Sequence, residues 1–279
     1  MLPEHTTAVD LLQDVIGAAL ATHTRPGPLV IGLCGAQGSG KSTLAAELAL
    51  RFARTVVLSL DDLYLTRAAR IKLACDVHPL LRTRGVPGTH DIGLGLDLFE
   101  ALDRGDDTPL PRFDKASDDR VAREHWPVAR GDTQVLLLEG WCVGARPQTV
   151  AALSEPVNAL ERDDDTDGRW RRYVNAALAG DYQRLFARLD RLVLLAAPGF
   201  SIVRDWRTQQ ESALRAVAGS DATGVMDDAE LVRFIAHYER LTRHVLAEMP
   251  GRADLTIRLD EMRRPVAAIS RDARRDASR

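Results

Sequence analysis

The chain has 279 residues, of which 45% are hydrophobic and 28% are charged, and its formal net charge is −3. This composition is ordinary for a globular protein that is large enough to bury a core. The charge balance lacks the basic footprint of proteins that bind nucleic acid or anionic membranes, so we expect neither as a partner. An anionic substrate would have to be held by a local basic cluster.

The cysteines and the N-terminal segment indicate the cellular compartment in which we expect the protein. Cys34, Cys75 and Cys142 are scattered and odd in number, which predicts reduced thiols rather than disulfides or a metal cluster. The first residues lack the pattern of a signal peptide, and no apolar run approaches the roughly 18 residues of a membrane span. We therefore expect a cytoplasmic protein.

Hydrophobic spacing predicts alternating helices and strands. Continuous apolar segments predict buried strands at 29–34, 55–60, 134–138, 192–196 and 255–259. Helical spacing covers 6–23, the segment that ends at about 53, and 66–75, 92–102, 169–189, 201–218 and 227–248. Buried strands separated by helices predict an α/β fold, a three-layer doubly wound parallel sheet of the kinase type with a helical lid.

We expect one domain over residues 1–265, with an N-terminal helix within 1–27 and the lid at about 198–218. Residues 266–279 are rich in Arg, Asp and Ser, and we expect a frayed tail there. The acidic run at 161–168 could hold a metal ion. Its spacing fits no calcium loop, however, and we expect a solvated turn.

The segment between the strand at 29–34 and the next helix matches the phosphate-binding pattern G-x-x-x-x-G-K-[ST]. Its residues are Gly35, Ala36, Gln37, Gly38, Ser39, Gly40, Lys41 and Ser42, and Thr43 follows. Backbone N–H groups of such a loop bind phosphate oxygens at a helix N-terminus. Lys41 is expected to reach the β- and γ-phosphates and to act in catalysis, and the Ser42 hydroxyl to ligate Mg²⁺. The loop therefore predicts a nucleoside triphosphate site.

Acidic residues follow two of the predicted strands, at the sheet edge where ligands bind in doubly wound folds. Asp61 would lie beside the phosphate loop and could accept the proton of an attacking hydroxyl. Asp61 or Asp62 could instead cap a turn, and we favour Asp61 as the base. Glu139 is expected to face Mg²⁺, its water molecules or the substrate, although a buried ion pair is the alternative.

Two polar segments are candidates for binding the acceptor. The loop 84–91 contains Arg84, His90 and Asp91 among glycines and a proline, which is typical of sites mounted on a rigid scaffold. Lys115 is one of only three lysines in an arginine-rich chain, and it could mark a place that needs a compact charge.

Arg204 and Arg207 lie one turn apart near the start of the helix at 201–218. Lid arginines of phosphotransferases neutralise charge on the transferred phosphoryl group, so we expect these two residues to contact the nucleotide. The alternative is a solvated basic face that pairs with Asp205 and Glu211.

Taken together, the motifs resemble the D-glycerate 3-kinase family of P-loop kinases, of the plant and fungal type, related to phosphoribulokinase, uridine kinase and pantothenate kinase. The resemblance covers residues 29–264. It rests on the phosphate loop and on "SLDDLYLT" at 59–66, "RGVPGTHD" at 84–91, "RFDKA" at 112–116, "LLEGW" at 137–141 and "DWRTQQE" at 205–211, in that order.

The resemblance implies that ATP and Mg²⁺ serve to phosphorylate a primary hydroxyl of a small acid, D-glycerate first of all. It implies that Asp61 is the catalytic aspartate, that Tyr64, His90, Asp91 and Lys115 lie near the acceptor, and that Arg207 is the lid arginine. The carboxylate of glycerate needs a cationic partner, for which Arg84 and Lys115 are candidates.

The segment 158–178 departs from the family pattern, because it is longer and more acidic than expected. This departure leaves the substrate open. A nucleoside or a pantothenate-like alcohol is the alternative acceptor. An ATP-dependent switch or assembly factor is a further alternative, although the Asn-Lys-x-Asp signal of GTPases is absent.

Overall fold

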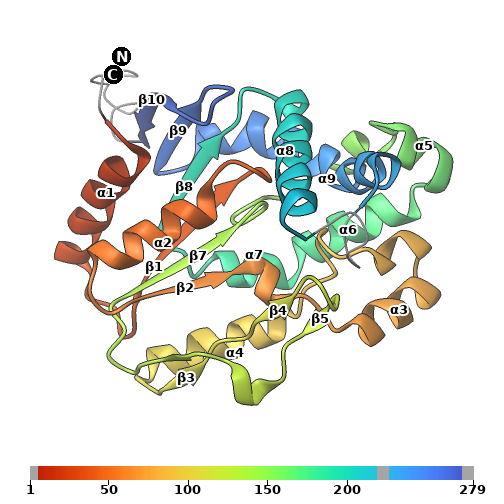
Figure 1. Cartoon of the computed structure of the whole chain (residues 1–279). Coiled ribbons are helices and arrows are strands. Elements are labelled where there is room, and N and C mark those ends of the chain that lie inside the picture. Colours follow the sequence, from red (N-terminus) through yellow and green to blue (C-terminus); the bar gives the residue numbers. More distant parts are fainter. Residues whose placement is uncertain (1–5, 219–225, 272–279) are drawn as a thin grey trace.

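The computed structural model describes residues 6–218 and 226–271. A six-stranded sheet forms its centre, in the order β10-β9-β8-β1-β7-β2. Its strands are β1 (Leu29–Gly35), β2 (Thr55–Ser59), β7 (Val135–Gly140), β8 (Arg191–Ala196), β9 (Leu255–Leu259) and β10 (Pro265–Ser270). All neighbouring pairs are parallel except β9 and β10, which are antiparallel. Figure 1 shows the sheet between two layers of helices.

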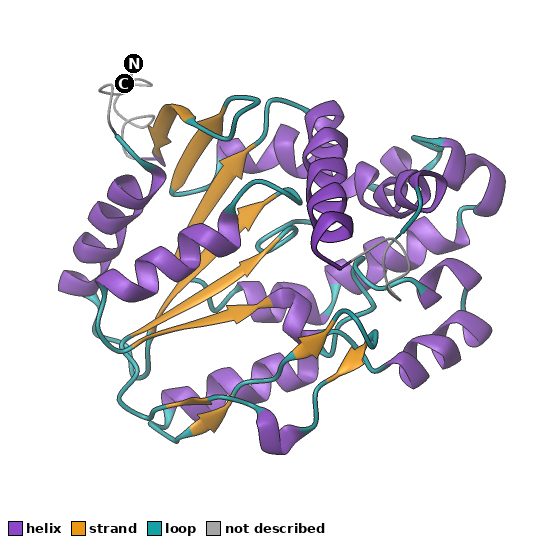
Figure 2. Cartoon of the chain, viewed as in Figure 1, coloured by secondary structure: helices purple, strands orange, loops and turns teal. Residues whose placement is uncertain are grey.

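The longer helices lie where the sequence pattern predicts them, and shorter elements fill the connections (Figure 2). The helices are α1 (Ala8–Thr22), α2 (Lys41–Arg51), α3 (Arg67–Asp76), α4 (Ile92–Asp103), α5 (Ala159–Asp164), α6 (Arg169–Ala179), α7 (Asp181–Phe186), α8 (Phe200–Ala218) and α9 (Asp228–Glu248). Two small hairpins pair β3 (Thr108–Pro109) with β6 (Val128–Ala129) and β4 (Phe113–Asp114) with β5 (Asp119–Arg120). No helix in the described ranges has the length and apolar character needed to span a membrane.

Side-chain alternation along the central strands creates two hydrophobic cores. Leu29, Ile31 and Leu33 of β1 pack with α1 and α2 on one face, whereas Val30 and Cys34 pack with α4 and α7 on the other. Both faces are buried because parallel strands feed helices to both sides of the sheet. The predicted three-layer α/β fold is confirmed.

The sheet continues past residue 265, so the predicted tail is wrong for residues 266–270. Val266, Ala267, Ala268 and Ile269 form β10 beside β9, with Ala268 opposite Ile257. The charged residues that suggested fraying begin only after this apolar stretch, and residues 272–279 lie outside the described ranges. A short apolar strand at a sheet edge gains backbone hydrogen bonds that composition alone does not reveal.

The helix predicted at 169–189 is instead two helices. Gly180 has φ −88° and ψ −123°, which separates α6 from α7 and lets α7 turn onto the core. Glycine lowers the cost of such a break because it lacks a Cβ atom.

The acidic run at 161–168 is only in part a solvated turn, because two of its carboxylates are buried. Glu161 is 1% exposed and accepts hydrogen bonds of 2.7 and 2.6 Å from the Arg240 guanidinium of α9. Asp165 is fully buried and pairs with Arg171 at 3.0 Å. Arg240 of α9 and Arg171 of α6 make this burial possible, because buried carboxylates are retained when they are paired and hydrogen-bonded.

Candidate active site

The phosphate-binding loop connects β1 to α2 at the carboxyl edge of the sheet. Gly38 and Gly40 have φ angles of +78° and +86°, which glycine adopts without strain. A Cβ atom on Gly38 would come within 2.6 Å of the Trp206 Cβ of α8, so the loop and α8 are in close contact. Since α2 begins at Lys41, the loop places backbone N–H groups at a helix N-terminus. The structure thus brings together the predicted loop residues, Gly35, Ala36, Gln37, Gly38, Ser39, Gly40, Lys41, Ser42 and Thr43.

Ser42 and Glu139 meet at the end of β7. The Ser42 hydroxyl donates a hydrogen bond of 3.0 Å to Oε1 of Glu139. The second oxygen, Oε2, is buried and has no hydrogen-bond partner within the described residues. Buried polar atoms are normally paired, and carboxylate and hydroxyl oxygens are ligands that Mg²⁺ accepts. This oxygen pair therefore fits a magnesium site beside the loop.

Asp61 lies directly after β2, in the short 3-10 helix Leu60–Leu63. Its Oδ1 accepts a 2.8 Å hydrogen bond from the Tyr64 hydroxyl, and its Oδ2 accepts one of 2.7 Å from the Lys115 ammonium. Burial alone would raise the pKa of Asp61, but Lys115, Lys41 and Tyr64 together lower that pKa to about 2. Asp61 is therefore ionised at neutral pH.

The adjacent Asp62 has a structural role, because both of its carboxylate oxygens bind the neighbouring segment 112–113. Its Oδ1 accepts the Phe113 backbone N–H at 3.0 Å, and its Oδ2 accepts a hydrogen bond from Arg112 at 3.1 Å. These bonds hold the start of the β4–β5 hairpin, which carries Lys115 at its tip. The geometry favours Asp61 as the base and gives Asp62 a supporting role.

His90 lies in a buried aromatic cluster beside Asp61. Its ring stacks on Tyr64 with centroids 4.6 Å apart, and its Nδ1 lies 2.6 Å from the Tyr182 hydroxyl. That hydroxyl also accepts the Gly88 N–H, so a Tyr182 proton directed at Nδ1 would leave the His90 proton on Nε2. Burial lowers the pKa of His90 to about 4, and Nε2 has no partner in the described structure. His90 is thus a neutral, buried ring with one unpartnered nitrogen.

Two other residues of the 84–91 loop are engaged in the fold. Arg84 forms an ion pair with Asp118 of the β4–β5 hairpin. Asp91 caps α4 by accepting the Leu94 N–H at 3.1 Å, and it pairs with Arg120 at 3.1 Å. Contacts of Arg84 and Asp91 with an acceptor stay predictions.

Of the two lid arginines, only Arg207 lies near these residues. Its guanidinium is 5.7 Å from the Phe234 ring of α9, and its charge acts on the buried Tyr238 hydroxyl. Arg204 instead lines a groove of about 500 Å³ between α5, α8 and α9. In Figure 1, α5 and α9 lie on the side of α8 away from α2. A nucleotide contact of Arg204 stays a prediction.

Tyr238 on α9 is a site residue that no sequence motif marked. Its hydroxyl donates a hydrogen bond of 3.1 Å to the Arg84 carbonyl. A Cβ atom on Gly85 would lie 1.9 Å from that hydroxyl oxygen, so only glycine fits there. Burial raises the pKa of Tyr238, and the nearby Asp61 charge raises it further. Helical spacing on α9 indicates that Tyr238 is buried, but it does not say what Tyr238 contacts.

The turn between β9 and β10 also reaches the phosphate loop, which the sequence did not reveal. Arg263 Nε donates a hydrogen bond of 2.5 Å to the Gly38 carbonyl, and its guanidinium lies 5.1 Å from the Trp206 ring centroid. Trp206 Nε1 donates to the Glu261 carbonyl at 2.7 Å. These contacts join the loop, α8 and the sheet edge into one unit.

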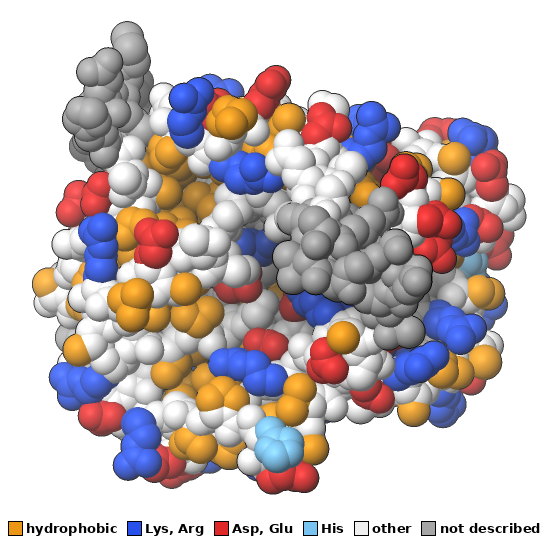
Figure 3. Space-filling model, in the orientation of Figure 1, with side chains coloured by type: hydrophobic (Ala, Val, Ile, Leu, Met, Phe, Trp, Pro, Cys, Tyr) orange, Lys and Arg blue, Asp and Glu red, His pale blue; other side chains and the backbone are white. Residues whose placement is uncertain are grey.

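Four buried polar atoms without hydrogen-bond partners gather around the phosphate loop and the ends of the strands. They are Gln37 Oε1, Ser39 Oγ, His90 Nε2 and Glu139 Oε2. Such atoms are costly unless a ligand or water pairs with them. Figure 3 shows basic and acidic side chains together in the hollow on this face. These are four of the eight buried, unpartnered side-chain atoms of the described residues, and the other four belong to Thr55, Arg120, Trp170 and His237.

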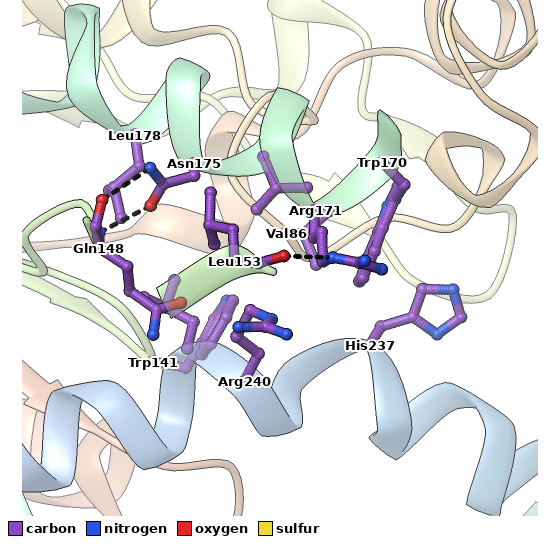
Figure 4. Close-up of a pocket in the computed structure, with 12 residues that line it drawn as sticks. Val86, Trp141, Gln148, Leu153, Trp170, Arg171, Asn175, Leu178, His237 and Arg240 are labelled. Carbon is purple, nitrogen blue, oxygen red and sulfur yellow. Dashed lines mark hydrogen bonds between the residues drawn. The ribbon is translucent and has the colours of Figure 1, made fainter. Parts of the chain in front are cut away.

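A separate small cavity of about 20 Å³ lies between α6 and α9 (Figure 4). Gln148 and Asn175 hydrogen-bond to each other at one end, through contacts of 2.7 and 3.1 Å. The volume admits about one water molecule and no nucleotide. This cavity belongs to the scaffold and not to the candidate site.

Comparisons with known proteins were made for the sequence and for the fold. No protein-family model matches the chain. The chain is 33% identical over 286 residues to the uncharacterized kinase mug58 of Schizosaccharomyces pombe, covering 93% of this chain and 99% of that protein. It is 31% identical over 263 residues to the chloroplastic D-glycerate 3-kinase of Arabidopsis thaliana. That match covers 86% of this chain and 54% of the plant protein, so the chain spans about half of that relative.

The fold is similar to a solved D-glycerate 3-kinase from Cryptococcus neoformans. The TM-score is 0.77 at 26% sequence identity, and the match covers 94% of this chain and 98% of the other. Near-complete coverage of both chains means that they share the whole architecture and not the phosphate loop alone.

Proposed function

This chain belongs to the family of P-loop kinases that includes the D-glycerate 3-kinases, and we propose that it transfers the γ-phosphoryl group of ATP to the 3-hydroxyl of D-glycerate. The observation that carries the substrate proposal is the pairing of Asp61 with Lys115 beside the phosphate loop. It places a carboxylate that can accept a hydroxyl proton next to an ammonium that can bind an acid. A small hydroxy acid offers both matching groups.

The nucleotide would bind through the phosphate loop. Its backbone N–H groups would hold the β- and γ-phosphate oxygens, and Lys41 would neutralise their charge. Ser42 Oγ and the Glu139 carboxylate would hold Mg²⁺, directly or through its water molecules. The unpartnered Glu139 Oε2 supports this assignment. Bound Mg²⁺ supplies positive charge that neutralises the phosphates.

The acceptor would lie between the β2 end and the β4–β5 hairpin. Lys115 would bind its carboxylate, because the Lys115 side chain is 61% exposed and therefore within reach of solvent. His90 Nε2 would donate a hydrogen bond to an acceptor oxygen in the tautomer that carries its proton there, since this atom has no partner within the described residues. Tyr64 fixes the orientation of Asp61 through its hydroxyl.

In the transfer step, Asp61 accepts the proton of the acceptor hydroxyl while the hydroxyl oxygen forms a bond to the γ-phosphorus. The bond from the γ-phosphorus to the bridging oxygen breaks, and ADP leaves with that electron pair. The proton then passes from Asp61 to solvent. Lys41 and Arg207 would stabilise the negative charge that develops on the phosphoryl oxygens.

A coupled assay of ADP release tests the proposal with D-glycerate, a nucleoside, pantothenate and ribulose 5-phosphate as acceptors. We expect D-glycerate to give a kcat/KM at least about a hundredfold above that of the other acceptors. Phosphorus NMR of the product should show a phosphomonoester on the primary oxygen, coupled to two protons. No stimulation by D-glycerate, or a clear preference for another acceptor, would refute the assigned substrate. It would leave the kinase family unchanged.

A further inference from the structure

The Lys115 ammonium donates a hydrogen bond to Asp61, the proposed catalytic base, and this bond can protect ATP from hydrolysis. We propose that Lys115 is a latch on Asp61 that the carboxylate of the acceptor releases, so that the base is freed only when an acidic acceptor is bound. The inference rests on the proposed function of this site, and it adds a mechanism against wasteful hydrolysis of ATP.

Together with Tyr64, Lys115 engages both carboxylate oxygens of Asp61. Oδ1 of Asp61 accepts the Tyr64 hydroxyl at 2.8 Å, and Oδ2 accepts the Lys115 ammonium at 2.7 Å. The Tyr64 side is closed, because Tyr64 is buried and stacked on His90. A substrate hydroxyl that reaches Oδ2 would therefore share this oxygen with the Lys115 ammonium. An ammonium on that oxygen also makes the carboxylate a weaker base.

The hairpin that carries Lys115 is fixed, so only the side chain has to move. Asp118, three residues further on, bonds to the buried Arg70 at 2.9 Å and also pairs with Arg84. Asp114 accepts the backbone N–H groups of Ala116 and Ser117 at 2.9 and 3.2 Å, which shapes the tip. The long, exposed Lys115 side chain can exchange one carboxylate for another without moving this backbone.

A carboxylate on the acceptor is the group that can draw Lys115 away. Arg84, a second cation beside the hairpin, is already held by Asp118 and lies over the Phe113 ring at 5.6 Å. The acceptor carboxylate therefore competes with Asp61 for one ammonium. A neutral alcohol offers no such competitor and leaves the latch closed. An acceptor must therefore carry a negative charge to free Asp61, which then activates the acceptor hydroxyl.

Without an acceptor, water is the nucleophile that the latch restrains. In that reaction Asp61 would take a proton from water, the water oxygen would bond to the γ-phosphorus, and the bond to the bridging oxygen would break. The products are ADP and inorganic phosphate, and the proton passes to solvent. Removal of the Lys115 ammonium should therefore raise hydrolysis in buffer that contains only Mg²⁺ and ATP.

The test compares ADP release without any acceptor in Lys115→Met, in Lys72→Met and in the unchanged protein. Lys72 is the matched control, because it is an exposed lysine that pairs with Asp76 on α3, away from the site. We expect hydrolysis to rise about tenfold in Lys115→Met and to stay unchanged in Lys72→Met. Adding Asp61→Asn to Lys115→Met should abolish the rise. A change below twofold in a folded Lys115→Met protein that binds ATP normally would overturn the latch.

An acceptor series separates the latch from the proposed substrate. In Lys115→Met, the kcat/KM ratio of D-glycerate over glycerol should fall by about a hundredfold, whereas Lys115→Arg should keep most of it. An unchanged ratio would overturn the role of the carboxylate. If the unchanged protein fails to phosphorylate D-glycerate, the proposed substrate is wrong. The hydrolysis experiment still decides the latch, because it contains no acceptor.

Discussion

Replacing Asp61 with asparagine tests the base directly. Asparagine keeps the size of the side chain, and its oxygen can still accept the Tyr64 hydroxyl, but the amide cannot take a proton from the acceptor. Loss of a positioned base costs about a hundredfold to ten-thousandfold, so the activation barrier should rise by about 3–5 kcal/mol. Lys41 and Ser42 are unchanged, and the Kd for ATP should therefore stay within about threefold.

Asp62→Asn is the matched control, one residue away. The asparagine oxygen can still accept the Phe113 N–H, whereas the partly buried ion pair with Arg112 is lost, which should cost stability and not the proton transfer. We expect kcat of Asp62→Asn to stay within about fivefold of the original value. Steady-state kinetics and ATP titration calorimetry measure both variants. The assignment fails if Asp61→Asn retains more than about a fifth of kcat, or if Asp62→Asn loses as much as Asp61→Asn.

Two further predictions concern stability. Burial lowers the pKa values of His90 and His237 from 6.5 to about 4, so between these values the folded protein binds fewer protons than the unfolded chain. The free energy of unfolding should therefore fall by about 2 kcal/mol per histidine as the pH is lowered from about 7.5 to about 5. In urea titrations, His237→Gln should remove the part of this fall that His237 contributes. An unchanged pH dependence in that variant would contradict the prediction. Glu161→Ala should cost about 3–5 kcal/mol, because it leaves the Arg240 guanidinium buried without its carboxylate, and a loss below about 1 kcal/mol would refute that account.

Local sequence patterns predicted the residues that lie at strand ends. The phosphate loop, Asp61 and Glu139 all follow buried parallel strands, and parallel strands deliver their carboxyl ends to one edge of the sheet. The strand pattern, together with the rule that ligands bind at the carboxyl edge of a parallel sheet, therefore predicts from the sequence that these groups lie near each other. The family resemblance and the α/β fold were confirmed for the same reason, because both depend on motifs with fixed spacing.

Contacts between distant segments could not be predicted in this way. Tyr238 reaches the Arg84 carbonyl across 154 residues, and no pattern near either residue encodes that pairing. The acidic run misled for the same reason. Glu161 looks like a surface charge until Arg240, 79 residues away, is placed beside it. A charged residue can be buried when an oppositely charged partner is placed beside it, and the sequence of one segment shows only one of the two residues.

Both of these long-range contacts, Tyr238 with Arg84 and Glu161 with Arg240, involve α9, which supports the proposed acceptor site. Arg240 and Tyr238 lie two residues apart on α9, so the ion pair with Glu161 fixes the helix that places the Tyr238 hydroxyl. That hydroxyl holds the Arg84 carbonyl and fills the space beside Gly85, at the start of the loop that ends in His90. The acidic segment that departs from the family pattern is thus connected, through α9, to the loop proposed to bind the acceptor. We therefore expect substitutions in this segment to act on the proposed acceptor loop through α9.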